Sequence, residues 1–390
     1  MKQRTSASLV KTIMTEFAGE TGLSPASSAP RRYLWTDAFA VRNFLGLHQE
    51  TGSEEFKGLA LRLVDQVHDT LGRHRKDDSR TGWISGLDEE QGKKHPTRGG
   101  LRIGKQLQER GPTAPFAERL EWDRDGQYYH YLTKWMHALN GVTKDTGDFT
   151  YNSWAIELAR TAHSRFVYAP SPGRQKRMFW KMSIDLSYPL VPSMGQHDPL
   201  DGLVTYSQLH ATAAEGSEQP AEDLRAEISG MANMCQGKSW ATDDPLGIGG
   251  LLADAFRVSQ LMVKGLFVQM GLLSNLLHAS VAGLKAFGKQ DSLNLPADYR
   301  LAFREFGLSI GLEAVERLLE LVERNGHTFG KDHDLQAAMK ALKQYEALKE
   351  VINHFWLQPE SQEAESWIAH RDINRVMLAT SLSPDGYLRL

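Results

Sequence analysis

The amino-acid sequence predicts an all-α protein in which helical hairpins close into an (α/α)6 toroid. Apolar residues recur mainly at helical spacing, a helix–turn–helix pattern occurs twice, and strand patterns are few and short. The two copies cover residues 35–71 and 130–166, at an offset of 95 residues. A repeated hairpin with few strands favours one closed helical domain spanning residues 1–390.

The two copies share a Thr-Gly pair at the turn, Thr51-Gly52 in the first and Thr146-Gly147 in the second. Apolar residues follow both turns at four-residue spacing, namely Leu59, Leu63 and Val67 in the first copy and Trp154, Leu158 and Ala162 in the second. This spacing puts them on one face of each second helix. Each copy is therefore predicted to bury that face against its partner helix.

Further helices are predicted along the rest of the chain by the same spacing. The predicted pairs are 198–210 with 221–234, 245–263 with 266–287, 296–324 with 334–355, and the terminal helices 6–18 and 370–382. With the two repeated hairpins these make about six pairs, as a closed toroid of inner and outer helices needs.

Three segments have strand character, with β-branched and aromatic residues between turn residues. Residues 100–105 form one, and residues 165–168 pair with 177–185 across the turn at 170–174. We expect small β-hairpins on one rim of the helical toroid. Strands do not alternate with helices along the chain, which argues against a parallel sheet.

Composition excludes several classes of partner. The 45 basic and 48 acidic residues give a net charge of −3, without the basic excess that nucleic-acid binding requires. The most apolar stretch, 261–284, contains Lys264 and His278, so a buried helix is expected in place of a membrane span. With no signal-peptide pattern and the single cysteine Cys235, the chain is expected to be cytoplasmic.

The helix that begins at Tyr33-Leu34-Trp35-Thr36-Asp37, and the inserted hairpin at 178–185, carry a resemblance. In architecture the chain, over 6–382, resembles the six-hairpin glycosidase-like superfamily. That superfamily includes inverting glycoside hydrolases and the N-acylglucosamine and cellobiose 2-epimerases. The resemblance implies a sugar site in a central polar pocket. No catalytic motif of any one family matches, so none of its catalytic residues is carried over.

The segment leading into the second repeat contains the first candidate site residues. Asp125 and Tyr129 precede a helix on which His130, Lys134 and His137 fall at positions i, i+4 and i+7, forming one polar stripe. The stripe either is the solvated face of an outer helix or lines a central cavity. His130 and His137 are seven residues apart, which is a long separation for two histidine ligands of one metal ion.

A second candidate lies around His197. Asp198 precedes a proline, so it can cap the helix that starts there, and Asp201 follows in its first turn. Capping explains Asp198 but not His197, and the flanking Gly195 and Gly202 permit close approach of another group. We therefore expect His197 and Asp198 to serve function more than stability.

Other candidates lie farther along the chain or on the predicted rim. Asp244 precedes Pro245 and is expected mainly to cap a helix, whereas His370 and Arg371 begin the last helix and are expected to face the cavity. Arg102, in the predicted strand at 100–105, can reach a ligand carboxylate or phosphate from the rim.

Aromatic residues beside paired polar groups suit a sugar, whose ring faces stack on aromatic rings and whose hydroxyls need donors and acceptors. The expected catalytic residues are Asp125, His130, His197, Asp198 and His370. The expected substrate-binding residues are Trp35, Asp37, Arg102, Tyr129, Lys134, Trp180, Lys181, Asp185, Asp201, Asp244 and Arg371.

Three functions are compatible with these residues. Glycoside hydrolysis would use two of the carboxyls Asp125, Asp185, Asp198 and Asp244. Epimerisation or isomerisation would use histidines such as His130, His197 and His370 as acid and base. A helical binding protein without chemistry is the third. Hydrolysis is the leading interpretation, with a small-molecule sugar as partner and without a metal or cofactor; the sequence leaves the sugar and the oligomeric state open.

Overall fold

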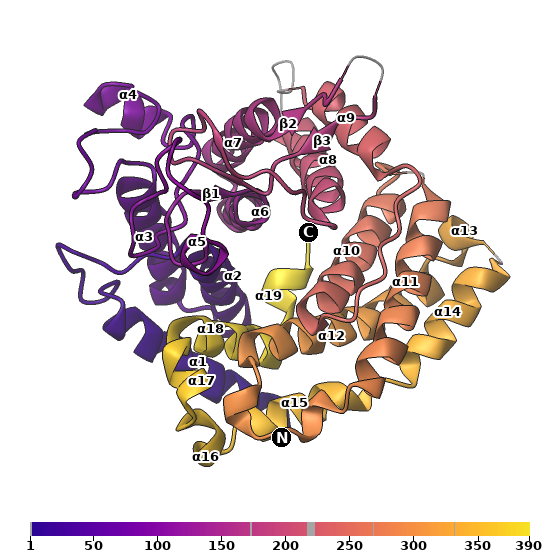
Figure 1. Ribbon diagram of the computed structural model, residues 1–390. Coiled ribbons are helices and arrows are strands. Elements are labelled where there is room, and N and C mark those ends of the chain that lie inside the picture. Colours follow the sequence, from indigo (N-terminus) through magenta and orange to yellow (C-terminus); the bar gives the residue numbers. More distant parts are fainter. Residues whose placement is uncertain (1, 172–173, 217–222, 268, 331) are drawn as a thin grey trace. The chain divides into compact units, whose positions relative to one another are not determined.

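The computed structural model describes residues 2–171, 174–216, 223–267, 269–330 and 332–390, and most of them lie in α-helices (Figure 1). The chain divides into two compact units. One comprises Ala18–Gln236, and the other combines Met1–Phe17 with Gly237–Leu390. The all-α class predicted from the sequence is confirmed. Closure of the hairpins into one ring, in a single domain, stays a prediction.

The first unit contains three consecutive helical hairpins. Their helices are α2 (Leu34–Thr51) with α3 (Glu54–Leu71), α6 (Tyr129–Thr146) with α7 (Thr150–Phe166), and α8 (Asp198–Gly216) with α9 (Arg225–Cys235). The first helices of the hairpins pack side by side, α2 on α6 and α6 on α8, while the second helices cover them (Figure 1). Two short helices, α4 (Glu89–Lys94) and α5 (Glu118–Glu121), lie in the connections.

The predicted hairpin repeat is confirmed. The helix boundaries of the first copy lie 95 residues before those of the second at both ends of the first helix and at the end of the second helix. Each first helix ends at a glycine in the left-handed region, Gly52 with φ 69° and Gly147 with φ 74°. Their backbone N–H groups donate to the carbonyls of His48 and Thr143. Glycine adopts this conformation without a Cβ penalty, so the Thr-Gly pair fixes where both helices stop.

The second unit is built around α10 (Pro245–Val263) and α12 (Ala302–Arg324), which cross at very short range. A Cβ at Gly249 would lie 1.9 Å from the carbonyl oxygen of Gly307, and one at Gly311 would lie 2.5 Å from the Cα of Gly249. These three glycines let the two backbones touch, which a larger residue at any of them would prevent.

Further helices complete the second unit. They are α11 (Met270–Lys289), α14 (His333–Lys343), α15 (Ala347–Trp356) and α18 (Arg371–Leu382), with most of α1 (Lys2–Glu20) and the short η1 (Ser292–Asn294), η2 (Ala297–Tyr299), α13 (Gly326–Phe329), α16 (Pro359–Gln362), α17 (Glu365–Ala369) and α19 (Asp385–Leu388). Among the described residues, α10 alone is long and apolar enough to span a membrane, and 72% of its apolar window is buried inside the protein. This burial is typical of a core helix.

Several predicted helix boundaries needed correction. The helix predicted at 334–355 is two helices, α14 and α15, separated by a turn, and the one predicted from 296 starts at Ala302 after two 3-10 turns. The helix predicted at 221–234 is observed as α9 from Arg225, and residues 221–222 lie outside the described residues. The last helix, predicted from His370, begins at Arg371.

Two small antiparallel sheets accompany the helices of the first unit. β2 (Val167–Tyr168) pairs with β3 (Arg177–Met178), as predicted, across a turn of which residues 172–173 lie outside the described residues. β1 (Gln127–Tyr128), β4 (Lys181–Met182) and β5 (Pro189–Val191) form the other sheet, in the order β1-β4-β5. The sheet brings the start of α6 beside residues 180–182.

The strand predicted at 100–105 is absent from the structure. Its backbone groups bond to three different elements instead of one neighbouring strand. The Arg102 N–H donates to the carbonyl of Leu71, and the Ile103 N–H donates to that of Gly126. The Ile103 carbonyl accepts the N–H of Leu34, at the start of α2. The apolar alternation of this segment therefore reflects burial of Leu101 and Ile103 without strand pairing.

A buried histidine in the first unit makes stability depend on pH. His68 accepts a hydrogen bond from Trp135 Nε1 at 3.2 Å, and burial lowers the pKa of its imidazole to about 3. The unfolded chain takes up this proton below about pH 6.5 while the folded chain does not, so stability is lost as pH falls from 6.5 towards 3. At pH 5 this one residue should account for about 2 kcal/mol of the loss.

Urea unfolding at pH 7.5 and pH 5.0 tests this expectation. His68→Gln should reduce the difference between the two pH values by about 2 kcal/mol, even if it lowers stability at both. His278→Gln removes an exposed histidine of α11 and should leave the difference as in the parent chain. An unchanged difference in His68→Gln would show that other groups cause the acid sensitivity.

Candidate functional site

His130, at the start of α6, is surrounded by four aromatic rings. The ring centroids of Tyr131, Tyr128, Trp35 and Trp180 lie 4.8, 5.4, 5.9 and 6.2 Å from the imidazole centroid. The Trp180 ring lies nearly parallel to the imidazole, at an interplanar angle of 18°. We refer to these five residues as the His130 cluster.

The His130 cluster is assembled from α2, β1, α6 and the residue before β4, all in the first unit. Trp35 comes from the first turn of α2, which packs on α6. Tyr128 ends β1, where it pairs with Lys181 of β4. This pairing, with the Tyr129 N–H donating to the Trp180 carbonyl at 3.4 Å, brings Trp180 to the start of α6. The small sheet therefore has a specific effect, because it places an aromatic ring over His130.

A carboxylate from α8 completes the surroundings of His130. The imidazole Nδ1 lies 3.9 Å from Asp198 Oδ1, and the His130 side chain is 23% exposed. Burial lowers the pKa of His130 to about 4, although the charge of Asp201 acts in the opposite direction. The imidazole is therefore neutral at pH 7 and able to accept a proton, and Asp198 would stabilise the imidazolium that forms.

The polar stripe on α6 faces α8. Lys134 Nζ donates to Asp201 Oδ1 at 3.0 Å, and His137 Nδ1 lies 3.0 Å from Gln208 Oε1. Lys134 and His137 are buried, so the interpretation of the stripe as a solvated face is wrong. The stripe forms a polar contact between two helices, and only its first member, His130, is partly open to solvent.

The loop before α8 is close to this cluster but is shaped by contacts within the protein. A Cβ at Gly195 would lie 2.5 Å from Asp198 Oδ2, and one at Gly202 would lie 2.3 Å from the Tyr129 hydroxyl. Both glycines thus allow the close approach that was expected, and the groups that approach them are side chains of the protein itself. His197 is half-buried, and its carbonyl accepts the Asp201 N–H at 2.9 Å.

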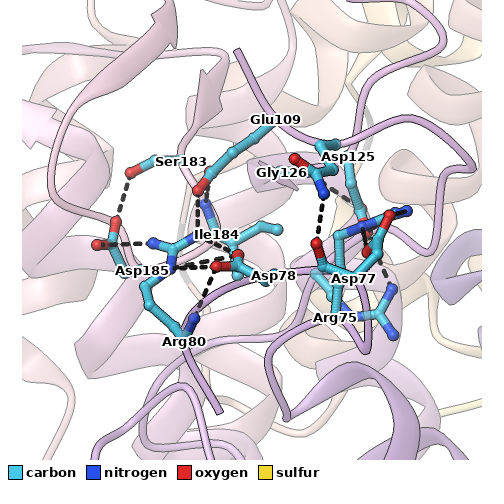
Figure 2. Close-up of polar contacts among 12 residues, drawn as sticks. Arg75, Asp77, Asp78, Arg80, Glu109, Asp125, Gly126, Ser183, Ile184 and Asp185 are labelled. Atoms are coloured by element: carbon cyan, nitrogen blue, oxygen red, sulfur yellow. Dashed lines mark hydrogen bonds and ion pairs between the residues drawn. The ribbon is translucent and has the colours of Figure 1, made fainter. Parts of the chain in front are cut away.

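Asp125 belongs to a separate charged network of the connecting loops (Figure 2). Its fully buried carboxylate accepts hydrogen bonds from Arg102 Nη1 at 2.9 Å, Arg75 Nη1 at 3.3 Å and the Gly104 N–H at 3.0 Å. Two guanidinium groups and a backbone amide surround it, which favours a structural role for Asp125, and its catalytic role stays a prediction. Arg102, expected to bind a ligand, donates to this carboxylate.

Asp185 lies in the second part of this network (Figure 2). Its carboxylate is 3.1 Å from Arg80 Nη1 and accepts the hydroxyl hydrogens of Ser183 and Ser187. Hydrogen bonds from these hydroxyls and the charge of Arg80 lower the pKa of Asp185 against the opposing effect of burial. Asp185 therefore closes a turn and is ionised.

Three predicted substrate-binding residues are enclosed by protein. Lys181 Nζ donates to Glu121 Oε1 at 3.0 Å and to the carbonyls of Glu121 and Arg124. The Tyr129 hydroxyl donates to Tyr206 at 2.8 Å, and Asp37 accepts the Tyr33 N–H at 2.9 Å. These side chains are almost fully buried, which argues against the direct contacts with a substrate that were expected of them.

In the second unit, Asp244 caps α10 by accepting the Gly247 N–H at 3.1 Å, and its other oxygen lies 3.1 Å from Arg304 Nη1. The cap is as predicted. His370 and Arg371 are exposed at the start of α18, and the His370 ring lies 5.5 Å from that of Phe303. Whether this segment meets the His130 cluster stays a prediction.

Sequence reasoning missed Tyr33, Tyr128 and Tyr131. The Tyr33 and Tyr131 hydroxyls are 2.8 Å apart, and their rings extend the aromatic surface from His130. The density of tyrosine around His130 in the run Tyr128-Tyr129-His130-Tyr131 was the available signal. In the part of the chain that the structure describes, no three His, Cys, Asp or Glu side chains gather as a metal site would need.

Comparisons with known proteins gave structural similarities only. No protein-family model and no curated protein matched the sequence. The cellobiose 2-epimerase of Spirochaeta thermophila DSM 6192 aligns over 95% of this chain and 97% of its own, with 11% identity and a TM-score of 0.48. A sugar epimerase from a ruminal bacterium aligns over 90% of this chain and 87% of its own, with 9% identity and a TM-score of 0.46. A D-mannose isomerase aligns over 87% of this chain and 97% of its own, with 12% identity and a TM-score of 0.44.

Proposed function

We propose that this chain is a sugar epimerase or isomerase in which His130 transfers the proton. The observation that carries the proposal is the His130 cluster itself. A neutral imidazole, partly open to solvent, lies 3.9 Å from a carboxylate and is walled by aromatic rings. Aromatic faces suit the apolar faces of a sugar, and the neutral imidazole of His130 can accept a proton.

The proposed reaction acts on the open-chain form of the sugar, which has a carbonyl group. His130 removes the hydrogen on the carbon next to the carbonyl, and the electron pair of that C–H bond moves to the carbonyl oxygen, giving an enediolate. Asp198 stabilises the imidazolium. Delivery of a proton from water or a second acid to the opposite face of the same carbon gives the epimer, while the imidazolium releases its proton to solvent. Return of the proton from His130 to the former carbonyl carbon gives the isomer, and the proton of the neighbouring hydroxyl then passes to the former carbonyl oxygen. No atom is gained or lost overall.

Hydrolysis is less well supported, because three of the four carboxyls expected to perform it have structural partners. Asp125 binds two arginines, Asp185 binds Arg80 and two serines, and Asp244 caps a helix. Of these four carboxyls, Asp198 is the one that lies beside His130, whose side chain is partly exposed. Inversion needs two carboxyls that share one water, whereas removal of the proton by His130 needs one base beside a carboxylate, as the His130–Asp198 pair provides.

Hydrogen exchange with solvent tests the proposal. The purified chain is incubated in D₂O with a panel of aldoses, ketoses and disaccharides, and NMR follows the hydrogen next to the carbonyl. We expect deuterium at that carbon, together with the epimer or isomer, for at least one sugar. Material purified in the same way from cells lacking the chain controls for host enzymes. Release of monosaccharides from a glycoside without exchange would overturn the proposal in favour of hydrolysis.

A further inference from the structure

Lys105 is the last residue of the irregular segment 100–105 and differs from the buried lysines of this chain. Lys134, Lys181 and Lys349 each lie within 3.1 Å of a carboxylate oxygen. Lys105 is half-buried, yet within the described ranges of the chain its ammonium makes no ion pair and no hydrogen bond. Burial lowers its pKa, although the charges of Asp123 and Asp125 oppose this. An ammonium held in this way is prepared to bind an anion.

The side chain of Lys105 extends to the aromatic surface of the candidate site. Its Nζ lies 5.5 Å from the centroid of the Tyr33 ring. The Tyr33 ring contacts that of Tyr131 at 5.7 Å, and Tyr131 contacts His130 at 4.8 Å. Tyr33 and Tyr131 thus form a continuous aromatic path from Lys105 to His130.

The backbone around Lys105 is fixed by the charged network (Figure 2). Arg75 Nη1 donates to the Lys105 carbonyl at 2.5 Å, and Asp125 accepts the Gly104 N–H at 3.0 Å. Gly104 has φ 94°, and a Cβ there would lie 2.3 Å from the Arg32 carbonyl oxygen. The network of Asp125 with its two arginines therefore positions Lys105.

We infer that Lys105 binds an anionic substituent of the sugar, a phosphate or a carboxylate, while the reacting carbon lies at His130. The inference rests on the proposed function for the identity of the reacting end. The sugar ring would lie along Tyr33 and Tyr131, whose faces offer the apolar surface that stacking needs. A neutral sugar would leave the Lys105 ammonium unpaired.

Equilibrium binding tests the inference independently of turnover. A hexose, its 6-phosphate and its uronate are titrated against the parent chain by calorimetry. We expect one anionic sugar to bind about 10- to 100-fold more tightly than the neutral hexose, the range typical of hydrogen bonds to charged groups. Lys105→Met should remove this preference without changing affinity for the hexose, and Lys105→Arg should keep part of it. The phosphate and uronate distinguish the two anions.

Lys76→Met is the matched control, because Lys76 is an exposed lysine one residue from Arg75 and its loss changes the net charge equally. It should leave all affinities unchanged. Equal affinity of the parent chain for neutral and anionic sugars, or an equal loss of both in Lys105→Met, would overturn the inference. If anionic sugars bind through Lys105 but no sugar exchanges hydrogen with solvent, only the proposed function is contradicted. If neutral sugars exchange hydrogen and Lys105→Met changes no affinity, only the inference is contradicted.

Discussion

His130→Gln is expected to lower the rate of hydrogen exchange into the sugar by about 100- to 10,000-fold, the contribution typical of a positioned acid–base group. Glutamine keeps a polar side chain of similar length but cannot take up the proton. The rate is measured in D₂O by NMR, with the sugar that the parent chain exchanges fastest. Affinity for that sugar should change much less, because the aromatic walls formed by Trp35, Tyr128, Tyr131 and Trp180 remain.

The folded state is checked in the same preparation. The His130 side chain is 23% exposed and its neutral Nδ1 lies 3.9 Å from Asp198 Oδ1, so its replacement should cost less than about 2 kcal/mol of unfolding free energy. His354→Gln, at an exposed histidine of α15, should exchange at the parental rate. Full exchange by a folded His130→Gln chain would assign proton transfer to another group, with His197 and His370 as the next candidates.

Asp125→Asn is expected to cost about 3–5 kcal/mol of unfolding free energy, the range for removing one partner of a buried charge pair. The Asp125 carboxylate is fully buried and balances Arg75 and Arg102, whose side chains are only 11% and 13% exposed. The amide removes the negative charge and leaves both guanidinium groups without it. Urea unfolding followed by tryptophan fluorescence measures the loss.

Asp77→Asn is the comparison variant, since Asp77 also pairs with Arg75 but is 53% exposed. Its replacement should cost less than about 1 kcal/mol. This pair of variants also decides between the two roles considered for Asp125. A folded Asp125→Asn chain with parental stability and no hydrogen exchange would restore the catalytic role expected from the sequence.

The helical hairpins were predictable because their signals are local. Apolar spacing gives the helices, and the Thr-Gly pairs at residues 51–52 and 146–147 give the points where two of them stop. The start of α10 after Asp244 was predictable for the same reason, since a cap and a proline act within one turn. The absence of a strand at 100–105 was not predictable, because strand pairing depends on partners far away in sequence. The alternating apolar pattern of this segment reflects burial of Leu101 and Ile103.

The candidate site was only partly predictable. His130, Asp198, Trp35 and Trp180 were named from the sequence, and the structure brings them together at the start of α6. Residue type alone could not separate them from Asp125, Tyr129 and Lys181. Those three have the same chemical groups, but their partners, at distances of 23 to 77 residues along the chain, bury them.

By itself the sequence determined that this chain is helical, that one hairpin is repeated, and that histidine, acid and aromatic side chains are available in the connecting segments. Helix spacing, glycine turns and side-chain chemistry are properties of neighbouring residues, so they can be read from the chain directly. Only the tertiary structure decided which charged groups are neutralised by partners. Arg102 and Lys105 illustrate this, since Arg102 is paired with Asp125 while the Lys105 ammonium lies near the Tyr33 ring, and burial and pairing depend on residues that only folding brings together.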